Sequence, residues 1–242
     1  MFRFENMSQK AVVLLSGGLD SSVTAYIAHD MGYNLAALSI DYNQAHVREL
    51  DSARKIAQHL NVLDHKIISL DLSLFGGSAL LTSTNTQIPT KISIDSIGKK
   101  IPPTYVPARN TIFLSLALAY AETIQADAIF IGVTAADYSG YPDCRPAFIE
   151  AFQTLANIAT KKTIEHNLIS IKTPIISDSK RIIIQKGQAL QVPFQDTWSC
   201  YQGKEKACGE CETCLLRLKG FNEASLPDPL PYETYPKWYK VH

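Results

Sequence analysis

An excess of one charge is missing from this sequence of 242 residues. Its 23 Lys and Arg residues are balanced by 23 Asp and Glu residues, so the formal net charge at pH 7 is zero. No net field is therefore available to hold the protein non-specifically on a nucleic acid or an anionic bilayer. We expect neither a nucleic acid nor a membrane as partner, and any nucleotide must be recognised by a local site.

Long apolar runs are also missing. The longest nearly apolar stretch, residues 112–121, is shorter than the roughly 20 residues that a membrane-spanning helix needs, and it fits a buried helix. The first ten residues carry charged and polar groups, and the apolar run after them ends at Leu15, so no secretory signal is recognised. These absences predict a cytoplasmic protein.

The sequence does contain enough apolar material for one continuous core, since 46% of its residues are hydrophobic and 19% are charged. Short apolar runs alternate with segments whose apolar residues recur at helical spacing. We expect strands at residues 11–15, 35–41, 62–70, 128–133 and 168–171, and helices at 21–32, 44–60, 109–125, 145–160 and 179–190. This alternation predicts an α/β fold with a doubly wound parallel sheet.

Two segments depart from the alternation. Residues 71–107 are rich in Ser, Thr, Gly and Pro and are too long for an idle connection, so we interpret them as a flap on the substrate side or a partner surface. A disordered excursion is the alternative. Residues 222–242 interleave prolines with aromatic residues, which indicates an extended tail packed on the body.

A glycine-rich turn follows the first expected strand. Glycines allow a tight turn, the helix N-terminus adds partial positive charge, and serine hydroxyls can donate to phosphate oxygens. The turn has neither the lysine of a Walker loop nor the G-x-G-x-x-G spacing of a dinucleotide loop. We interpret it as a phosphate site without a lysine, and a purely structural turn is the alternative. Its sequence is Ser16-Gly17-Gly18-Leu19-Asp20-Ser21-Ser22.

The string Ser-Gly-Gly-x-Asp-Ser-Ser resembles the pyrophosphate loop of the N-type ATP pyrophosphatases, which have an adenine nucleotide alpha hydrolase-like fold. Those enzymes adenylate a carbonyl-type oxygen and expel pyrophosphate. The resemblance implies that Asp20 and Ser21 are catalytic, that Mg²⁺ bridges the phosphates of ATP, and that Leu15 and Leu19 shape the turn. It implies an ATP-binding set of Leu15, Ser16, Gly17, Gly18, Leu19, Asp20, Ser21 and Ser22.

Four of the five cysteines lie within residues 200–214, with the spacing C-x7-C-x2-C-x2-C. Four thiolates this close together suit a closed tetrahedral zinc site, which is structural rather than catalytic. An iron–sulfur cluster and independent buried cysteines are the alternatives. The ligands would be Cys200, Cys208, Cys211 and Cys214. The fifth cysteine, Cys144, could be a core thiol, a substrate-facing residue or a nucleophile.

A third group of polar residues follows the strand expected at 128–133 and should lie at the same sheet edge as the glycine turn. Its carboxylates, aromatic rings and guanidinium could bind a flat heterocycle, with turn chemistry as the alternative. The group comprises Asp137, Tyr138, Tyr141, Asp143 and Arg145. Arg109 begins an expected helix, where it could bind a ligand or serve only as part of a helix cap.

The strings DYSGYPDCRP, VPARN and SCYQGKEKACGECETCLLRLKGF together resemble the 7-cyano-7-deazaguanine synthase family, the nitrile-forming enzymes of queuosine biosynthesis. The resemblance runs from the glycine turn to about Phe221. Two positions depart from the family pattern. Gln44-Ala45-His46 stands where Gln-Arg-His is usual, which removes a basic contact, and Thr134 stands where Asn is common, which alters the substrate pocket.

This resemblance implies that the substrates are 7-carboxy-7-deazaguanine, ammonia and ATP, and that the protein is a homodimer with one structural zinc ion per chain. Residues 137–145 would recognise the deazapurine, and Arg109 would bind phosphate or carboxylate as a catalytic residue. His46 and Asp143 are the candidates for a general base. The chain would divide into a catalytic domain (1–197), a zinc module (198–221) and the tail (222–242).

Proteins with two other functions would show some of the same sequence features. A tRNA thiolase would need a sulfur-relay cysteine and a basic face for RNA, and the balanced charge argues against such a face. A zinc-dependent scaffold or nucleotide sensor would bind ATP without spending it.

Overall fold

The computed structural model describes residues 9–43, 48–82, 87–135, 140–165 and 167–240. In this part of the chain, five strands form one sheet with the order β3-β2-β1-β4-β5, and every pairing is parallel. The strands are β1 (Lys10–Leu14), β2 (Asn34–Asp41), β3 (Asp64–Ser69), β4 (Ala128–Ile131) and β5 (Ser170–Lys172). The structure thus confirms the expected α/β class.

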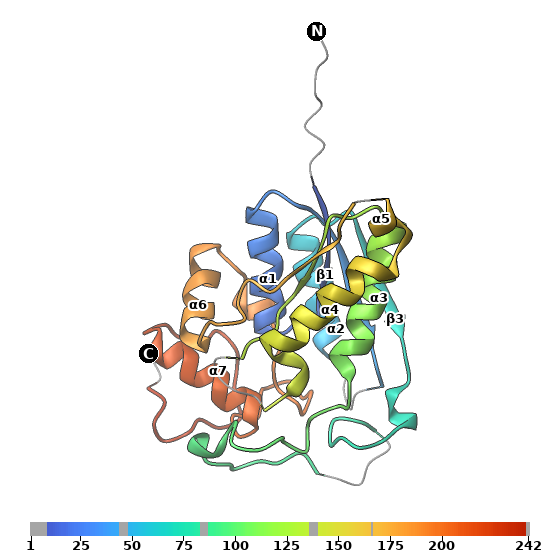
Figure 1. Ribbon diagram of the computed structural model, residues 1–242. Helices are drawn as coiled ribbons and strands as arrows, with labels where there is room; N and C mark the ends of the chain where they lie inside the picture. Colours follow the sequence, from blue (N-terminus) through green and yellow to red (C-terminus); the bar gives the residue numbers. More distant parts are fainter. Residues whose placement is uncertain (1–8, 44–47, 83–86, 136–139, 166, 241–242) are drawn as a thin grey trace.

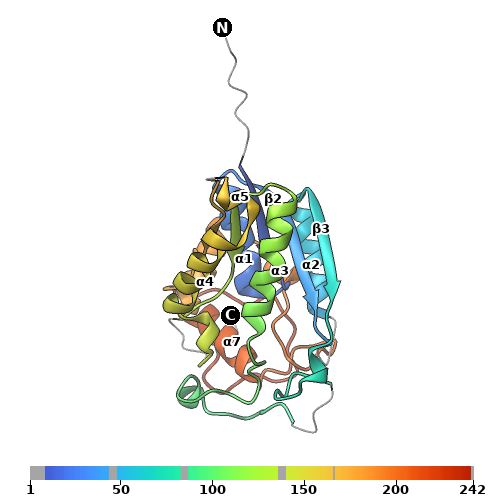
Figure 2. The ribbon, with the colours of Figure 1, turned by 45° about the vertical axis from the view of Figure 1, so that its right-hand side comes forward.

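Helices cover both faces of the sheet (Figures 1 and 2). On one face α1 and α2 share a core with the strands, and on the other face α3 and α4 do so. The helices are α1 (Leu19–Asp30), α2 (Arg48–His59), α3 (Arg109–Thr123), α4 (Pro146–Ala159), α5 (Lys161–Ile164), α6 (Lys180–Ala189) and α7 (Glu212–Glu223). None of the helices in the described residues is long and apolar enough to cross a membrane.

The central strand β1 shows why the sheet is doubly covered. Its side chains alternate between the two faces, so Val12 and Leu14 enter the core with α3, whereas Ala11 and Val13 enter the core with α1 and α2. All four are buried because both faces are covered by helices. A continuous apolar run, rather than an alternating one, is the sequence pattern that this burial requires.

The chain order reverses at β1, which pairs with β2 on one side and β4 on the other. Ligands of open parallel sheets bind at such a switch point, outside the carboxyl ends of the strands. In Figure 1 these ends point toward the side of the molecule where α7 and the green segment after β3 lie. The glycine turn, this segment and the cysteine cluster therefore surround one edge of the sheet.

The segment after β3 has little regular structure among its described residues. It contains two short 3-10 helices, η1 (Leu72–Leu74) and η2 (Ile94–Ser96). Leu72 and Val106 are buried in the core shared with α3, so the segment is anchored at both ends. Further short 3-10 helices, η3 (Pro142–Cys144) and η4 (Phe194–Asp196), come before α4 and the cysteine cluster.

The residues after α7 pack on the cysteine cluster. Ala207 pairs with Tyr232 through an isolated parallel bridge, and the Thr234 hydroxyl donates to the Cys208 carbonyl over 2.9 Å. A buried ion pair joins Arg217 of α7 to Asp228, with 2.8 Å between Nε and Oδ2. The tail is therefore part of the folded body.

Candidate active site and cysteine cluster

The glycine turn between β1 and α1 is held in shape by its own backbone and hydroxyls. Gly17 has a φ of +84°, and a Cβ there would lie 2.1 Å from the Glu49 carbonyl oxygen, so only glycine fits. The Gly18 N–H donates to the Ser16 hydroxyl oxygen (3.2 Å), and the Ser16 N–H donates to that of Ser21 (3.2 Å). The turn is thus preorganised before any ligand binds.

Ser22, the last residue of the turn, has an internal partner. Its buried hydroxyl donates to the Gly18 carbonyl over 2.8 Å. Ser22 therefore supports the start of α1, whereas Ser16, Asp20 and Ser21 face a cavity.

This first cavity has a volume of about 300 Å³ and lies at the carboxyl edge of β1 and β4. Its walls include the expected residues Leu15, Ser16, Gly18, Leu19, Asp20, Ser21, Arg109 and Tyr141. Gly17, Ser22, Asp143 and Arg145 are not among its lining residues. His46, with its neighbours Gln44 and Ala45, and the pair Asp137 and Tyr138 fall outside the described residues.

Lys180, the first residue of α6, lies beside the turn. Its Nζ is 2.7 Å from both carboxylate oxygens of Asp20, and it lines the first cavity. The turn is thus accompanied by a lysine, contrary to the expectation of a lysine-free site. Sequence reasoning missed Lys180 because 160 residues separate it from Asp20, and no local motif marks it.

Glu49 of α2 and Arg109, the first residue of α3, both line the first cavity. Burial raises the pKa of the Glu49 carboxyl to about 7, and the nearby Arg109 charge opposes that rise. The Arg109 guanidinium lies 5.8 Å from the centre of the Tyr42 ring. This edge of the cavity therefore combines a fixed positive charge with a carboxyl that titrates near neutral pH.

Asp143 caps α3 rather than facing the cavity. Its buried carboxylate accepts the Asn110 N–H over 3.0 Å, and the Asn110 side-chain amide donates to the Asp143 carbonyl over 3.0 Å. Asp143 therefore supplies the cap of α3, and Arg109 lines the first cavity. Arg145 is exposed just before α4.

The fifth cysteine, Cys144, is buried in the wall of the first cavity. Burial, followed by the neighbouring Asp143 charge, raises the pKa of its thiol to about 11. A thiol with such a pKa stays protonated at neutral pH and is a poor nucleophile. Of the three interpretations left open by the sequence, the raised pKa disfavours the nucleophile, whereas a core thiol and a substrate-facing residue both agree with a buried side chain in the cavity wall.

Thr134, which departs from the family pattern, also lines the first cavity. Its hydroxyl donates to the Asp178 carbonyl over 3.0 Å, so it ties the loop after β4 to the segment before α6.

A second cavity of about 460 Å³ lies between the segment after β3 and the start of α7. Tyr201 and Glu212 line both cavities, which therefore meet at these two side chains. The Tyr141 hydroxyl lies 3.1 Å from the Thr104 hydroxyl and 3.5 Å from that of Tyr201. Burial raises the pKa of Glu212, and a hydrogen bond with Thr104 opposes the rise. Sequence reasoning missed Glu212, which stands between two cysteines of the cluster.

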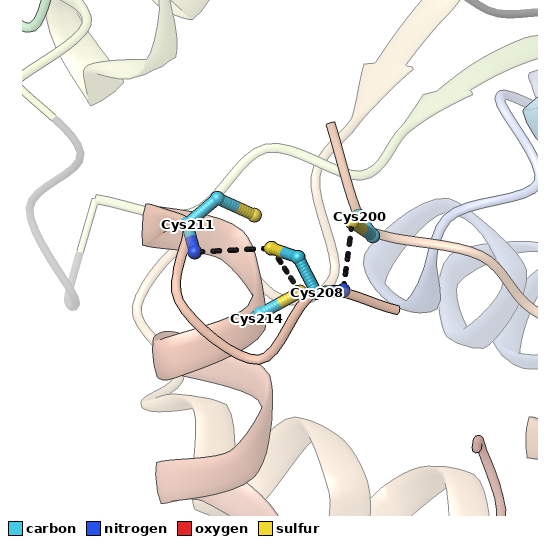
Figure 3. Close-up of side chains that lie close together, drawn as sticks. All are labelled: Cys200, Cys208, Cys211 and Cys214. Carbon is cyan, nitrogen blue, oxygen red and sulfur yellow. Dashed lines mark hydrogen bonds between the residues drawn. The ribbon is translucent and has the colours of Figure 1, made fainter. Parts of the chain in front are cut away.

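The four clustered cysteines converge on one point (Figure 3). Their sulfur atoms all lie within 4.8 Å of one another, and all four residues are buried. The Cys208 and Cys214 sulfurs are 3.8 Å apart, and the sulfurs of Cys200 and Cys208 accept backbone N–H groups over 3.3 Å. Four thiolates about 2.3 Å from a tetrahedral ion are about 3.8 Å apart. The cluster is thus compatible with a metal ion such as zinc.

Trp198 connects the cysteine cluster to the glycine turn. Its backbone N–H donates to the Gly17 carbonyl over 2.9 Å, and its ring N–H donates to the Cys200 carbonyl over 3.0 Å. The Arg48 guanidinium lies 3.7 Å from the centre of its ring, and the residue is only 1% exposed. The position of the turn is therefore coupled to that of the cluster.

Comparison with known proteins gives consistent matches over most of the chain. A family model described as the queuosine biosynthesis protein QueC matches residues 10–225. The 7-cyano-7-deazaguanine synthase of Desulfatibacillum aliphaticivorans is 52% identical over 227 residues, which are 93% of this chain and 97% of that protein. Those of Nostoc sp. (strain PCC 7120) and Thermoplasma acidophilum are 53% identical over 223 residues and 50% identical over 232 residues. These alignments cover 92% and 96% of this chain, and 97% and 95% of the relatives.

Proposed function

Since the chain belongs to the family of the queuosine biosynthesis protein QueC, we propose that it is an ATP-dependent ligase that makes 7-cyano-7-deazaguanine from 7-carboxy-7-deazaguanine and ammonia. The observation that carries the proposal is the first cavity. It places the preorganised turn, Lys180 and Arg109 around one space at the switch point of the sheet.

The first half of the reaction forms an amide. A carboxylate is a poor electrophile, so its oxygen first attacks the α-phosphorus of ATP, and pyrophosphate leaves. Ammonia then attacks the acyl carbon of the adenylate, AMP leaves with the carboxyl oxygen, and loss of a proton gives the amide. Holding the reactants in one cavity lowers the entropic part of the barrier.

The second half removes the amide oxygen. That oxygen attacks the α-phosphorus of another ATP, and pyrophosphate leaves again. The nitrogen then loses its two protons, the carbon–oxygen bond breaks, and AMP leaves the nitrile behind. Because both halves transfer an adenylyl group, a single phosphate site serves them both.

The roles of the residues follow from charge and position. The N–H groups of the turn and the Lys180 ammonium would stabilise the negative charge of the departing pyrophosphate. Asp20 and the hydroxyls of Ser16 and Ser21 offer the hard oxygen ligands that suit the Mg²⁺ of the ATP substrate. Arg109 would bind the α-phosphate or the substrate carboxylate.

The cysteine cluster fits a structural zinc ion. A closed shell of four buried thiolates leaves no open position for a substrate, and zinc would supply folding free energy rather than a catalytic step. Reduced thiols suit a reducing compartment, which supports the cytoplasm as the location of the enzyme.

A homodimer is the oligomeric state that we propose. Ile158 at the end of α4 and Ile164 at the end of α5 are 74% and 72% exposed, which supports burial of this surface against a second copy. Light scattering coupled to size-exclusion chromatography measures the mass directly.

A tRNA thiolase is disfavoured by Cys144. A sulfur-relay cysteine has to reach its thiolate form, and the raised pKa of this buried thiol opposes that form at neutral pH.

The proposal is tested by incubating the protein with ATP, 7-carboxy-7-deazaguanine and ¹⁵N-ammonium. We expect a ¹⁵N-labelled nitrile together with two AMP and two pyrophosphate molecules per nitrile. The Asp20→Ala variant should lose pyrophosphate release, while Asp30→Ala, at the exposed far end of the same helix, should keep it. ATP that is bound but not consumed would instead indicate a nucleotide sensor.

A further inference from the structure

Glu212 is a buried carboxylate between the two cavities. It is the first residue of α7, is 8% exposed, and lines both spaces. Within the described ranges, no Lys or Arg nitrogen lies within the 4.0 Å of an ion pair with it, although ten pairings of Lys or Arg with other carboxylates occur there. Thr104 is its hydrogen-bonding side chain.

Buried carboxylates are stable when they accept several hydrogen bonds or face a cation. Within the described ranges one neutral hydroxyl, that of Thr104, bonds to the Glu212 carboxylate, which has about four acceptor sites and lines both cavities. A ligand that completes the site should therefore present hydrogen-bond donors, and preferably two side by side.

The substrate of the proposed function has such an edge. A 7-deazaguanine ring carries N1–H and the 2-amino group next to each other, and a carboxylate can accept both with its two oxygens. We propose that Glu212 binds this edge and thereby makes the enzyme specific for a guanine-type heterocycle. The inference rests on the proposed function and adds the residue that reads the base.

The placement of the cavities agrees with this orientation. The 7-carboxyl group sits on the five-membered ring, at the opposite end of the heterocycle from the 2-amino edge. With that edge on Glu212, the carboxyl group can extend into the first cavity, which also contains Arg109 and the glycine turn. Tyr141 and Tyr201 stand beside the path and offer aromatic surface to a flat ring.

Glu212 also follows Cys211, so its role could be confined to the cysteine turn. Substrate specificity separates the two roles. A purely structural residue would affect zinc content and stability, but it would not distinguish a substrate with a 2-amino group from one without it.

The test compares two substrates with two variants. The substrates are 7-carboxy-7-deazaguanine and its analogue without the 2-amino group. Glu212→Gln keeps the size of the side chain, but only its amide oxygen accepts a hydrogen bond. Its NH₂ group donates and would therefore face one of the two N–H donors of the ligand without forming a hydrogen bond. The matched control is Glu223→Gln on the last turn of α7, whose side chain is 43% exposed and paired with Lys219.

For the wild type we expect kcat/KM to favour the natural substrate by about 10- to 100-fold, as for a lost charged hydrogen bond. Glu212→Gln should reduce this ratio to within about threefold by raising the KM of the natural substrate, with the KM of ATP and the zinc content unchanged. Glu223→Gln should retain the wild-type ratio.

A wild-type enzyme that uses both substrates equally would overturn the inference, as would a Glu212→Gln enzyme with the full preference. If Glu212→Gln does not fold, Glu212→Asp provides the same test, because its shorter carboxylate should weaken the preference in part. Failure of the wild type to form any nitrile would contradict the proposed function itself, whereas nitrile formation without discrimination at Glu212 would contradict only this inference.

Discussion

Lys180 and Asp20 show how single residues complete a site that the local motif leaves open. The glycine turn supplies backbone N–H groups and hydroxyls, but its own side chains include a carboxylate that would repel phosphate. The ammonium group 2.7 Å from that carboxylate offsets this charge and faces the same cavity. The ion pair is half-buried, so solvent screens it only in part.

Replacing Lys180 by Met should therefore weaken ATP use. Loss of a charge-assisted contact to phosphate is expected to lower kcat/KM for ATP by about 10- to 100-fold, since such a contact contributes about 1.5–3 kcal/mol. Pyrophosphate release at varied ATP concentrations measures the effect. Lys186→Met, on the same helix and paired with Asp178, is the control and should leave kcat/KM unchanged. Equal losses in both variants would contradict a specific role for Lys180.

Glu49 gives a prediction about pH. Its pKa is raised by burial to about 7 from an ordinary value of 4.5, so the folded state binds this proton more tightly than the unfolded chain does. The contribution of Glu49 to stability is thus fully present below about pH 4.5 and is lost as the pH rises through 7.

Glu49→Gln cannot ionise and should keep that contribution. The free energy of unfolding of the variant minus that of the wild type should therefore increase by about 2 kcal/mol between pH 5 and pH 8. This value is reduced to allow for the partial exposure of the side chain. Urea unfolding of both proteins at each pH measures the difference, and groups shared by both proteins cancel. A difference that is constant with pH would contradict the raised pKa.

Residues of the glycine turn and of the cysteine cluster could be singled out from the sequence because the members of each group lie close together along the chain. The cysteines at 200–214 come together as their spacing indicates, and the turn at residues 16–22, interpreted from its resemblance to a pyrophosphate loop, lines the first cavity. Lys180 and Glu212 could not be singled out, because their roles depend on which distant segments the fold brings beside them. Asp143 has the composition of a ligand-binding residue, yet its carboxylate meets the Asn110 N–H.

At the scale of elements, the helices and strands with clear periodicity were predictable to within a few residues. Helix α3, for example, was expected at residues 109–125 and spans Arg109–Thr123. Helix α7 was not expected. Its sequence, ETCLLRLKGFNE, mixes a cysteine of the cluster, a glycine and a buried arginine, which conceals the helical period. Burial of this arginine, Arg217, requires its ion-pair partner in the tail.

That partner, Asp228, should be critical for stability. Arg217 binds it through Nε and Nη2 (2.8 and 3.0 Å), and both side chains are almost completely buried. Asp228→Ala would leave the guanidinium unpaired, so we expect a loss of about 3–5 kcal/mol in the free energy of unfolding. Glu233→Ala breaks the exposed pair with Lys204 and should cost less than about 1 kcal/mol. Similar losses in both variants would show that the tail contributes only surface contacts.

At the scale of the whole molecule, alternation of strands and helices predicts the class of fold, and the order of the strands then determines where a ligand binds. The reversal of chain order at β1 brings the ends of β1 and β4, and the segments that follow them, around one cavity. The order itself could not be predicted from the alternation, since apolar runs in the five strands are similar. It depends on how α1 to α4 divide between the two faces.

Trp198 also couples the cysteine cluster to the glycine turn, and this coupling can be tested by replacing one of the clustered cysteines. Cys211→Ser should lower zinc content and the free energy of unfolding together, because binding free energy is folding free energy in such modules. Since Trp198 bonds to both the Gly17 and the Cys200 carbonyls, we also expect ATP affinity to fall by about tenfold or more, that is by at least about 1.4 kcal/mol.

Metal analysis, thermal unfolding and isothermal titration with a non-hydrolysable ATP analogue measure the three quantities on one preparation. Cys144→Ser removes the thiol that lies outside the cluster and should retain one zinc ion per chain, so it controls for the loss of a buried cysteine. If the zinc-depleted variant binds the analogue as tightly as the wild type, Trp198 does not transmit order from the cluster to the turn. The turn would then owe its shape to Gly17 and the serine hydroxyls alone.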